Sequence, residues 1–262
     1  MPTTIPSITS STRPGSPSAG DAYFETDTKN YIIYDGAAWR GFVSDGETLG
    51  ANGYSLDLDG TDDRVELGNI ATLNSASAFS LSFWVKLPSS SSSLTYFYQS
   101  GSDTFSNTIS FYQSTNMDFL LGTGSNYAAT RYAANIRDDQ WHHLAGVYNG
   151  STLVIYLDGA VPTQSNVGVS IPSSTVSTAG NSPHIGSKTD DSGALEGKMD
   201  DFSIFNAALT ATEVSNIYNS RLYNPTKLIH QYRFENNYND SKGSLNGTAQ
   251  GDPTFDSSDK PY

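Results

Sequence analysis

Apolar and polar residues alternate along most of the middle of the chain. Leu56 and Leu58 share one phase of this alternation, and Leu81, Phe83 and Val85 share another. Successive side chains of a strand point to opposite faces, so this spacing predicts strands with one apolar face. Asn-Gly and Asp-Gly pairs lie between several of the runs, and such pairs favour tight hairpin turns. The pattern therefore predicts antiparallel strands joined by short turns.

One predicted strand, over residues 197–206, carries a charge in its apolar phase. Asp200 falls in phase with Phe202 and Ile204. A buried carboxylate is costly unless it is paired or hydrogen-bonded, so the pattern predicts a partner for Asp200.

The period changes directly after this strand. The apolar residues that follow recur at helical spacing. They are Leu209, Val214, Ile217 and Tyr218. Thr210 and Glu213 have the spacing of a capping box, in which each side chain accepts a hydrogen bond from a free backbone N–H. We therefore expect one short helix, over residues 211–219.

Composition agrees with an all-β fold class. Aromatic residues, Gly and Ser are frequent, and strongly helical stretches are nearly absent. A chain of 262 residues is long for one domain but normal for a single sandwich with an appendage. We expect the sandwich over residues 47–262 and the appendage before it.

Five stretches in chain order resemble laminin-G-like and pentraxin-like domains, which are concanavalin A-like sandwiches. They are residues 55–67 (SLDLDGTDDRVEL), 79–86 (FSLSFWVK), 140–150 (QWHHLAGVYNG), 151–159 (STLVIYLDG) and 197–206 (GKMDDFSIFN). The resemblance implies a two-sheet antiparallel jelly-roll sandwich. It also implies a lectin-like domain, whose binding to glycans is expected only by analogy, because one fold serves many functions.

The C-terminal part is similar to the opening of the same domains. Residues 228–235 and 239–248 resemble the family's usual first strand and the loop after it, but here they come last. The two ends of a sandwich lie close enough for such a permutation. We therefore expect residues 228–262 to close the sandwich of the same chain.

The N-terminal appendage has two parts. Residues 1–20 are rich in Ser, Thr and Pro, and we expect an extended arm that lies across a neighbouring molecule. Residues 21–46 predict a small β-meander, and residues 20–42 resemble an element of tail-fibre and other virion proteins of tailed bacteriophages.

The meander is predicted to be the docking element, because so few strands are rarely stable alone. The docking residues would be its aromatic residues. They are Tyr23, Phe24, Tyr31, Tyr34 and Trp39. The alternative is that the meander folds back on its own sandwich as an extra edge.

Charge and cysteine content exclude several classes of function. The net charge is −13, and no cluster of Lys and Arg occurs, so nucleic acid is not an expected partner. The chain has no cysteine, which excludes disulfides, thiolate metal sites and a cysteine nucleophile. No signal-peptide pattern and no apolar run of about 18 residues is present, so we expect no membrane insertion.

Enzymatic activity is not expected. Glycoside hydrolases of this fold place two carboxylates in a Glu-x-Asp-x-x-Glu arrangement, and the nearest pair here, Glu196 and Asp200, does not have that spacing. A serine triad would need one of four histidines, and no G-x-S-x-G motif occurs. His142 and His143 are adjacent, so a strand points them to opposite faces, which defeats joint metal binding.

A calcium ion is the expected cofactor. Asp63 and Asp200 fall in the apolar phases of their strands, and related domains often hold one Ca²⁺ with oxygen ligands. The expected metal residues are Asp59, Asp62, Asp63 and Asp200. The alternative is that the two phase-matched carboxylates accept backbone N–H bonds at the strand ends.

Aromatic side chains could stack on sugar rings, because one face of a pyranose is apolar. The glycan-binding residues that we expect are Tyr112, Tyr127 and Tyr132, which lie in the middle segment where the family's rim loops fall. The alternative is packing, because most Tyr residues of a sandwich are packing residues with a satisfied hydroxyl.

Together these observations predict a non-enzymatic structural protein of a bacteriophage virion. It would decorate the capsid or form part of a tail fibre, expose its lectin-like domain at the virion surface, and contact other virion proteins through the meander. A homo-oligomer, with a trimer as the expected state, and a cell-surface glycan would be its other partners. The alternative is a secreted carbohydrate-binding module or polysaccharide hydrolase of the same fold.

Overall fold

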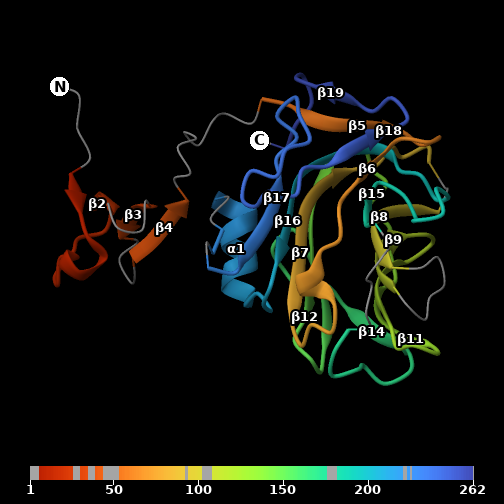
Figure 1. Ribbon diagram of the computed structural model, residues 1–262, viewed down its shortest axis with the longest axis horizontal. Coiled ribbons are helices and arrows are strands. Elements are labelled where there is room, and N and C mark those ends of the chain that lie inside the picture. Colours follow the sequence, from red (N-terminus) through yellow and green to blue (C-terminus); the bar gives the residue numbers. More distant parts are fainter. Residues whose placement is uncertain are drawn as a thin grey trace.

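The computed structural model describes most of the chain. The described residues are 6–25, 30–34, 39–43, 53–91, 94–101, 108–175, 182–220, 223–224 and 226–261. Among the described residues from 53 onward, the strands form two antiparallel sheets that face each other, and one α-helix lies on the outside of one of them (Figure 1). This confirms the predicted two-sheet sandwich with one short helix.

The helix-bearing sheet has seven strands. Its order is β13 (Leu153–Leu157), β12 (Trp141–Tyr148), β7 (Phe79–Lys86), β16 (Glu196–Phe205), β5 (Ser55–Asp59) and β19 (Thr254–Asp256), and β17 (Leu228–Tyr232) also pairs with β16. Strand β16 is central, because it pairs with β7 along one side and with β5 and then β17 along the other.

The second sheet has eight strands. Its order is β14 (Gln164–Gly168), β11 (Tyr127–Tyr132), β10 (Met117–Gly122), β9 (Thr108–Gln113), β8 (Thr95–Gly101), β15 (His184–Ile185), β6 (Arg64–Glu66) and β18 (Thr248–Gln250). A 3₁₀ turn, Ala71–Leu73, lies between β6 and β7, and it buries Leu73.

The core lies between the two sheets and is rich in phenylalanine. Phe83 of one sheet packs on Phe97 and Phe111 of the other, with ring centroids 5.5 and 5.4 Å apart. Phe202 stacks on Phe83 at 5.4 Å. Burying such side chains is the main favourable contribution to folding of a sandwich.

Helix α1, Ala211–Ser220, covers part of the outer face of the seven-stranded sheet. Val214 and Ile217 belong to a second apolar cluster with Phe205 and Leu209. The capping box forms, because Thr210 N–H donates to Glu213 (2.8 Å) and Glu213 N–H donates to the Thr210 hydroxyl (3.2 Å). The predicted helix is therefore confirmed. No helix in the described part of the chain has the length and apolar character needed to cross a membrane.

The C-terminal part closes the sandwich, as expected. Strand β17 pairs with β16 of one sheet, and β18 and β19 pair with β6 and β5. The Asp240 carboxylate organises the loop after β17, because it accepts hydrogen bonds from the His230 ring (2.6 Å) and from the backbone N–H of Gly243 (2.9 Å). Although burial opposes ionisation, these hydrogen bonds lower the pKa of Asp240 to about 2.

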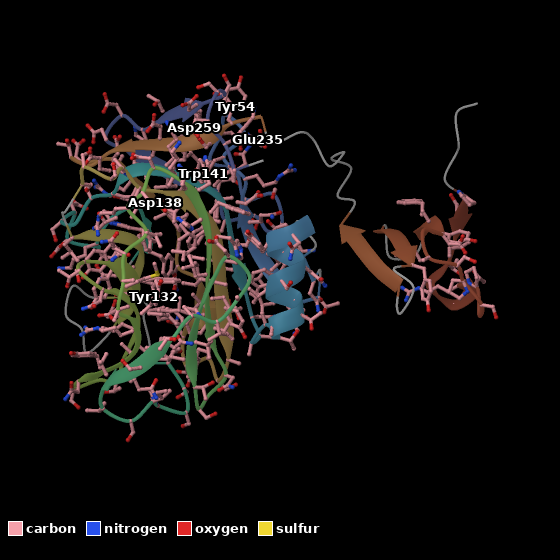
Figure 2. All side chains as sticks on the ribbon, turned by 180° about the vertical axis from the view of Figure 1, so that it is seen from behind. Tyr54, Tyr132, Asp138, Trp141, Glu235 and Asp259 are labelled. Carbon is pink, nitrogen blue, oxygen red and sulfur yellow. The ribbon has the colours of Figure 1, made fainter. Side chains whose placement is uncertain are left out.

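The two ends of the sandwich lie together. Glu235 accepts a hydrogen bond from Gly53 N–H at 2.9 Å. Asp259 accepts from Lys86 Nζ and from Trp141 Nε1, both at 2.9 Å. Figure 2 shows Glu235 and Asp259 at the same end of the sandwich as Tyr54. The permuted order of the family strands is possible because of this proximity.

The N-terminal appendage forms a separate four-stranded sheet in the order β1 (Ser7–Ile8), β2 (Ala22–Glu25), β3 (Asn30–Tyr34) and β4 (Trp39–Val43). The arm is not simply extended, because β1 pairs in parallel with β2 and a 3₁₀ turn, Ser10–Thr12, follows. The carbonyl of Pro6 accepts a hydrogen bond from Phe24 N–H at 2.9 Å, so the arm supplies a backbone partner to β2, a strand of its own meander. The strands of the meander pair with one another, so among the described strands it is not an extra edge of the sandwich.

The predicted docking residues are distributed over three strands of the meander. Tyr23, Phe24 and Tyr34 are half-buried, and Ile32, which lies opposite Tyr23 in the neighbouring strand, is buried. The side chains of Tyr31 and Trp39 lie outside the described part. Docking itself stays a prediction.

Candidate functional site on the outer face of the eight-stranded sheet

Alternation along β10 divides its side chains between the core and the outside. Met117, Phe119 and Leu121 belong to the main core. Asp118 and Leu120 therefore point to the outer face of the sheet. The same rule applies to the neighbouring strands, and it collects charged and aromatic side chains on this face. We call this set the charged face: Arg64, Glu66, Tyr96, Tyr112, Asp118, Leu120, Tyr127, Ala129, Arg131, Val167 and His184.

An ion pair lies at the centre of β9, β10 and β11. Arg131 donates to both oxygens of Asp118, with Nε–Oδ1 at 2.7 Å and Nη2–Oδ2 at 2.8 Å. The Tyr112 hydroxyl donates to the same carboxylate at 2.8 Å. Cross-strand pairing fixes this geometry, because Asp118 lies opposite both Tyr112 and Arg131. The hydrogen bond to Asp118 raises the pKa of Arg131, so its charge is permanent.

Aromatic rings lie beside this ion pair. Tyr96 and Tyr112 stack with ring centroids 5.0 Å apart. They form a small apolar cluster with Leu120 and Ala129, and Tyr127 packs at its margin. Burial, with the nearby carboxylates of Asp190 and Asp118, raises the pKa of Tyr96 to about 12.

The predicted glycan residues divide between the two faces. Tyr112 and Tyr127 lie on the charged face, but Tyr132 packs against the main core. Its partner across the strands is Met117, a core residue. Tyr132 is therefore no part of the same site, because strand alternation turns it inward. Tyr112 is 9% exposed, so Tyr127 is the tyrosine that a ligand could reach more easily.

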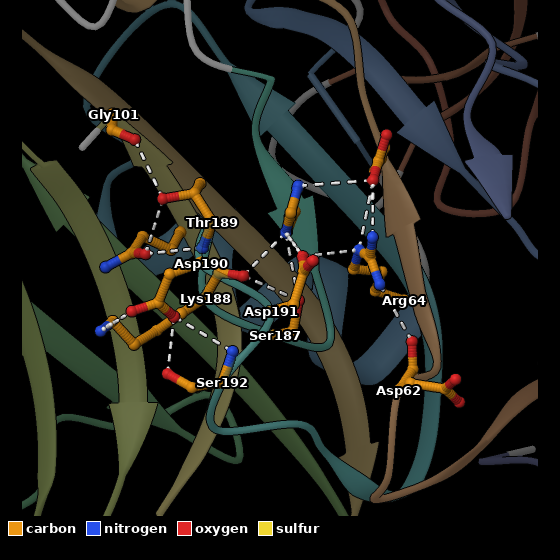
Figure 3. Close-up of polar contacts among 12 residues, drawn as sticks. Asp62, Arg64, Gly101, Ser187, Lys188, Thr189, Asp190, Asp191 and Ser192 are labelled. Carbon is orange, nitrogen blue, oxygen red and sulfur yellow. Dashed lines mark hydrogen bonds and ion pairs between the residues drawn. The ribbon is translucent and has the colours of Figure 1, made fainter. Parts of the chain in front are cut away.

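A polar loop between β15 and β16 lies over β8. Gly193 accepts a hydrogen bond from Tyr96 N–H at 3.0 Å, and Thr189 N–H donates to Gln99 at 2.8 Å. Lys188 Nζ pairs with Asp190 at 2.7 Å (Figure 3). Although burial opposes ionisation, hydrogen bonds from Lys188 and Ser192 lower the pKa of Asp190 to about 2.

A second ion network lies on β6 and β15 (Figure 3). Arg64 contacts Glu66 at 3.0 Å and Asp191 at 3.1 Å. The ring of His184 lies 3.8 Å from each of these carboxylates, and its Nδ1 is 2.8 Å from the Lys188 carbonyl. Glu66, His184 and Asp191 have the separation of metal ligands. The Arg64 guanidinium forms an ion pair with each of the two carboxylates, so we assign the group to a salt-bridge network.

The predicted calcium residues come together only in part. Ligand oxygens of Asp59, Asp62 and Asp63 lie within 4.8 Å of one another. Asp63 is buried, and its two oxygens accept backbone N–H bonds from Asp59 (3.0 Å) and Asp252 (2.8 Å). Burial raises the pKa of Asp63. Backbone hydrogen bonds thus account for Asp63, and the exposed Asp59 and Asp62 are the groups that could hold a cation.

Asp200 does not join this group. It is fully buried, as expected, but its phase differs from the predicted one. A bulge follows it in β16, and Asp201 has a left-handed φ of 47°. Because neighbouring Met199 lies in the core, Asp200 points to the outer face of the seven-stranded sheet. Four strand positions separate it from Glu196, which pairs with Asp59, so the distance is roughly 13 Å.

A Ser–His pair on the other sheet was not predicted. Ser82 Oγ lies 2.8 Å from His143 Nε2, and both residues are at most 1% exposed. Trp84 and Tyr218 of α1 pack on the imidazole, with centroids 5.3 and 5.9 Å away. Burial lowers the pKa of His143 to about 4, so the ring is neutral. A substrate could not reach this pair in the described structure, and the contacts are those of packing.

Sequence reasoning also missed Asp118 and Arg131. The signal was weak but present, because Asp118 interrupts the apolar strand MDFLLG and Arg131 follows three small residues in YAATRY. Nothing in the sequence indicated that these strands are neighbours in this register.

The fold is a two-sheet antiparallel β-sandwich of the concanavalin A-like type. Residues 59–215 match the model of the concanavalin A-like lectin/glucanases superfamily, so the chain belongs to this family. A search of curated proteins found no match.

Two solved structures are similar to the chain. A heptameric SAP-like pentraxin from Limulus polyphemus has 14% sequence identity and a TM-score of 0.52, over 78% of this chain and 94% of that one. A proposed carbohydrate-binding protein from Bacteroides ovatus has 16% identity and a TM-score of 0.56, over 94% of this chain and 71% of that one. At such identities the similarity shows the fold alone.

Proposed function

We propose that the chain is a non-enzymatic glycan-binding module of a bacteriophage virion, in which the sandwich binds the glycan and the N-terminal meander attaches to other virion proteins. The observation that carries the glycan part is the charged face. It offers an apolar surface, formed by the half-buried Tyr127 and Val167, beside the polar Arg131, whose side chain is 34% exposed. Membership in a lectin superfamily supports the same proposal.

A sugar ring needs both kinds of surface. Its apolar face would lie on Tyr127 and Val167, and its hydroxyls would accept hydrogen bonds from Arg131. Asp118 holds the guanidinium in place through two hydrogen bonds, so little conformational entropy is lost when a ligand binds.

The glycan part is tested by binding to a glycan array. We expect Arg131→Ala and Tyr127→Ala to lower affinity at least about tenfold, as for residues central to an interface. Asp138→Asn is the matched control, because Asp138 contacts His142 and is not part of the charged face. Unchanged binding by both face variants would contradict this site, and an array without any bound glycan would contradict the glycan function.

The virion part rests on the resemblance of residues 20–42 to elements of phage tail-fibre and virion proteins. Capsid decoration and a place in a tail fibre are both consistent with it, and a trimer is the oligomer that we propose. Particles assembled with a chain lacking residues 1–45 provide the test. We expect a soluble, folded sandwich that is absent from the particles by negative-stain microscopy, and normal incorporation would contradict the docking role.

A secreted carbohydrate-binding module is the second candidate. The similarity to the Bacteroides ovatus protein supports it, because that protein is described as a carbohydrate-binding protein. This candidate predicts glycan binding by a soluble protein and no association with phage particles. Release of reducing sugar from a bound polysaccharide would instead favour a hydrolase.

A further inference from the structure

We infer that the charged face selects neutral glycans and rejects anionic ones, an inference that rests on the proposed glycan function. Its basis is the pairing of cations on this face and in the polar loop between β15 and β16 beside it. Arg131 pairs with Asp118, Lys188 with Asp190, and Arg64 with Glu66 and Asp191. Within the described residues, each of these three cations therefore has its own carboxylate partner.

The Arg131 pair is the one nearest to the apolar surface. Asp118 is 2% exposed at its side chain, so the carboxylate cannot move away to release the guanidinium. Two parallel hydrogen bonds of 2.7 and 2.8 Å use the Nε/Nη2 edge of the guanidinium, one of the two edges that can receive a sulfate or carboxylate, and place a negative charge directly against the cation. Arg131 can still offer neutral hydrogen bonding, but its charge is already compensated.

The second pair reinforces this effect. Asp190 and Asp118 both act on the hydroxyl of Tyr96, so two carboxylates lie near this tyrosine. Lys188 Nζ lies 2.7 Å from Asp190, and Ser192 holds the opposite oxygen of that carboxylate at 2.6 Å. The electrostatic potential over β8, β9 and β10 is therefore set largely by two cations, Arg131 and Lys188, that are already paired with carboxylates.

Two undescribed segments that connect strands of this sheet add no positive charge. Residues 102–107 (SDTFSN) and 176–181 (VSTAGN), which connect strands of this sheet, contain no Lys or Arg and one Asp. The whole chain has a net charge of −13. An anionic glycan would approach against this charge without gaining a new ion pair.

A matched pair of ligands tests the inference. Oligogalactose and oligogalacturonate of equal length differ mainly in the carboxylate, and titration calorimetry at low and at high NaCl measures both. We expect at least a tenfold preference for the neutral oligomer and less than a twofold change of its Kd with salt. A salt-sensitive preference for the uronate, or for a sulfated galactose oligomer, would overturn the inference and leave the glycan function standing.

The variant Asp118→Asn provides the sharper test, because it removes the compensating charge and preserves shape. We expect it to gain at least fivefold in affinity for oligogalacturonate, with a new dependence on salt. The double variant D118N/R131Q should lose this gain, and Asp138→Asn should behave as the unmodified chain. Thermal melting identifies a variant that fails to fold. In that case Asp190→Asn tests whether removal of the carboxylate that pairs with Lys188 also raises the affinity for oligogalacturonate.

Each outcome decides between the two proposals. No change in the uronate affinity of a folded D118N variant would overturn the charge compensation argument. Absence of binding to neutral, carboxylated and sulfated oligomers alike would overturn the glycan function itself, and the inference with it.

Discussion

The outer faces of the two sheets are covered in different ways. Helix α1 covers the seven-stranded sheet with apolar side chains, and even the polar pair Ser82 and His143 is sealed below it. The eight-stranded sheet is covered by a polar loop, and its ion pairs reach the surface, since Asp191 is 54% and Arg131 34% exposed at the side chain. An apolar cover contributes stability, whereas a charged one leaves groups available to a ligand.

The largest expected difference between the faces is in stability. Phe205→Ala removes a fully buried ring from the cluster below α1, and we expect a loss of about 4 kcal/mol in the free energy of unfolding. Tyr127→Ala on the charged face, which is half-buried, should cost less than about 1 kcal/mol. Urea denaturation measures both. Equal losses would contradict the assignment of one face to stability and the other to binding.

A smaller effect is expected from pH at the helix-covered face. The folded pKa of His143 is lowered from 6.5 to about 4, so the unfolded chain binds the proton first. Stability is then fully present above 6.5 and falls as pH decreases toward 4, by about 2.5 kcal/mol between about pH 7 and pH 4.5.

His142 provides the matched comparison for this prediction. A hydrogen bond to Asp158 raises its pKa, so its contribution is fully present below 6.5 and is lost as pH rises through the raised value. Denaturation at several pH values should show that His143→Gln removes the acid-side loss and that His142→Gln does not. If His142→Gln removed the acid-side loss and His143→Gln did not, the environments described for these two histidines would be wrong.

The Asp118–Arg131 pair should have a moderate effect on stability. Asp118→Ala leaves Arg131 without its partner, but this side chain is one-third exposed and water can solvate the charge. We therefore expect a loss of about 1 to 2 kcal/mol, below the usual cost of breaking a fully buried pair. D118A/R131M measured beside both single variants gives the coupling energy. A loss as large as that of Phe205→Ala would show that the pair is structural.

The smallest expected effect concerns calcium. If Asp59 and Asp62 hold Ca²⁺, a concentration about ten times Kd stabilises the fold by about 1.4 kcal/mol, which raises Tm by roughly 3 to 5 °C. Asp62→Asn should abolish the shift, whereas Asp138→Asn should not. Melting that is unaffected by Ca²⁺ and by a chelator would leave the backbone hydrogen bonds of Asp63 as the full explanation.

The sequence by itself determined the elements and their class. Alternation predicted the strands, the capping residues Thr210 and Glu213 predicted the helix, and the family motifs predicted the closure by residues 228–262. These features are local, or they follow from a pattern of motifs in a fixed order, so they can be read without knowing which strands are neighbours.

Only the tertiary structure decided which side chains meet. The bulge after Asp200 reversed its face, and the pairing of β10 with β11 brought Asp118 to Arg131 while turning Tyr132 into the core. Arg64, which carried no signal in the sequence, forms ion pairs with both Glu66 and Asp191. The physical reason is that one added residue in a strand changes the face of every side chain beyond it, and the register between strands is fixed by packing across the whole sandwich.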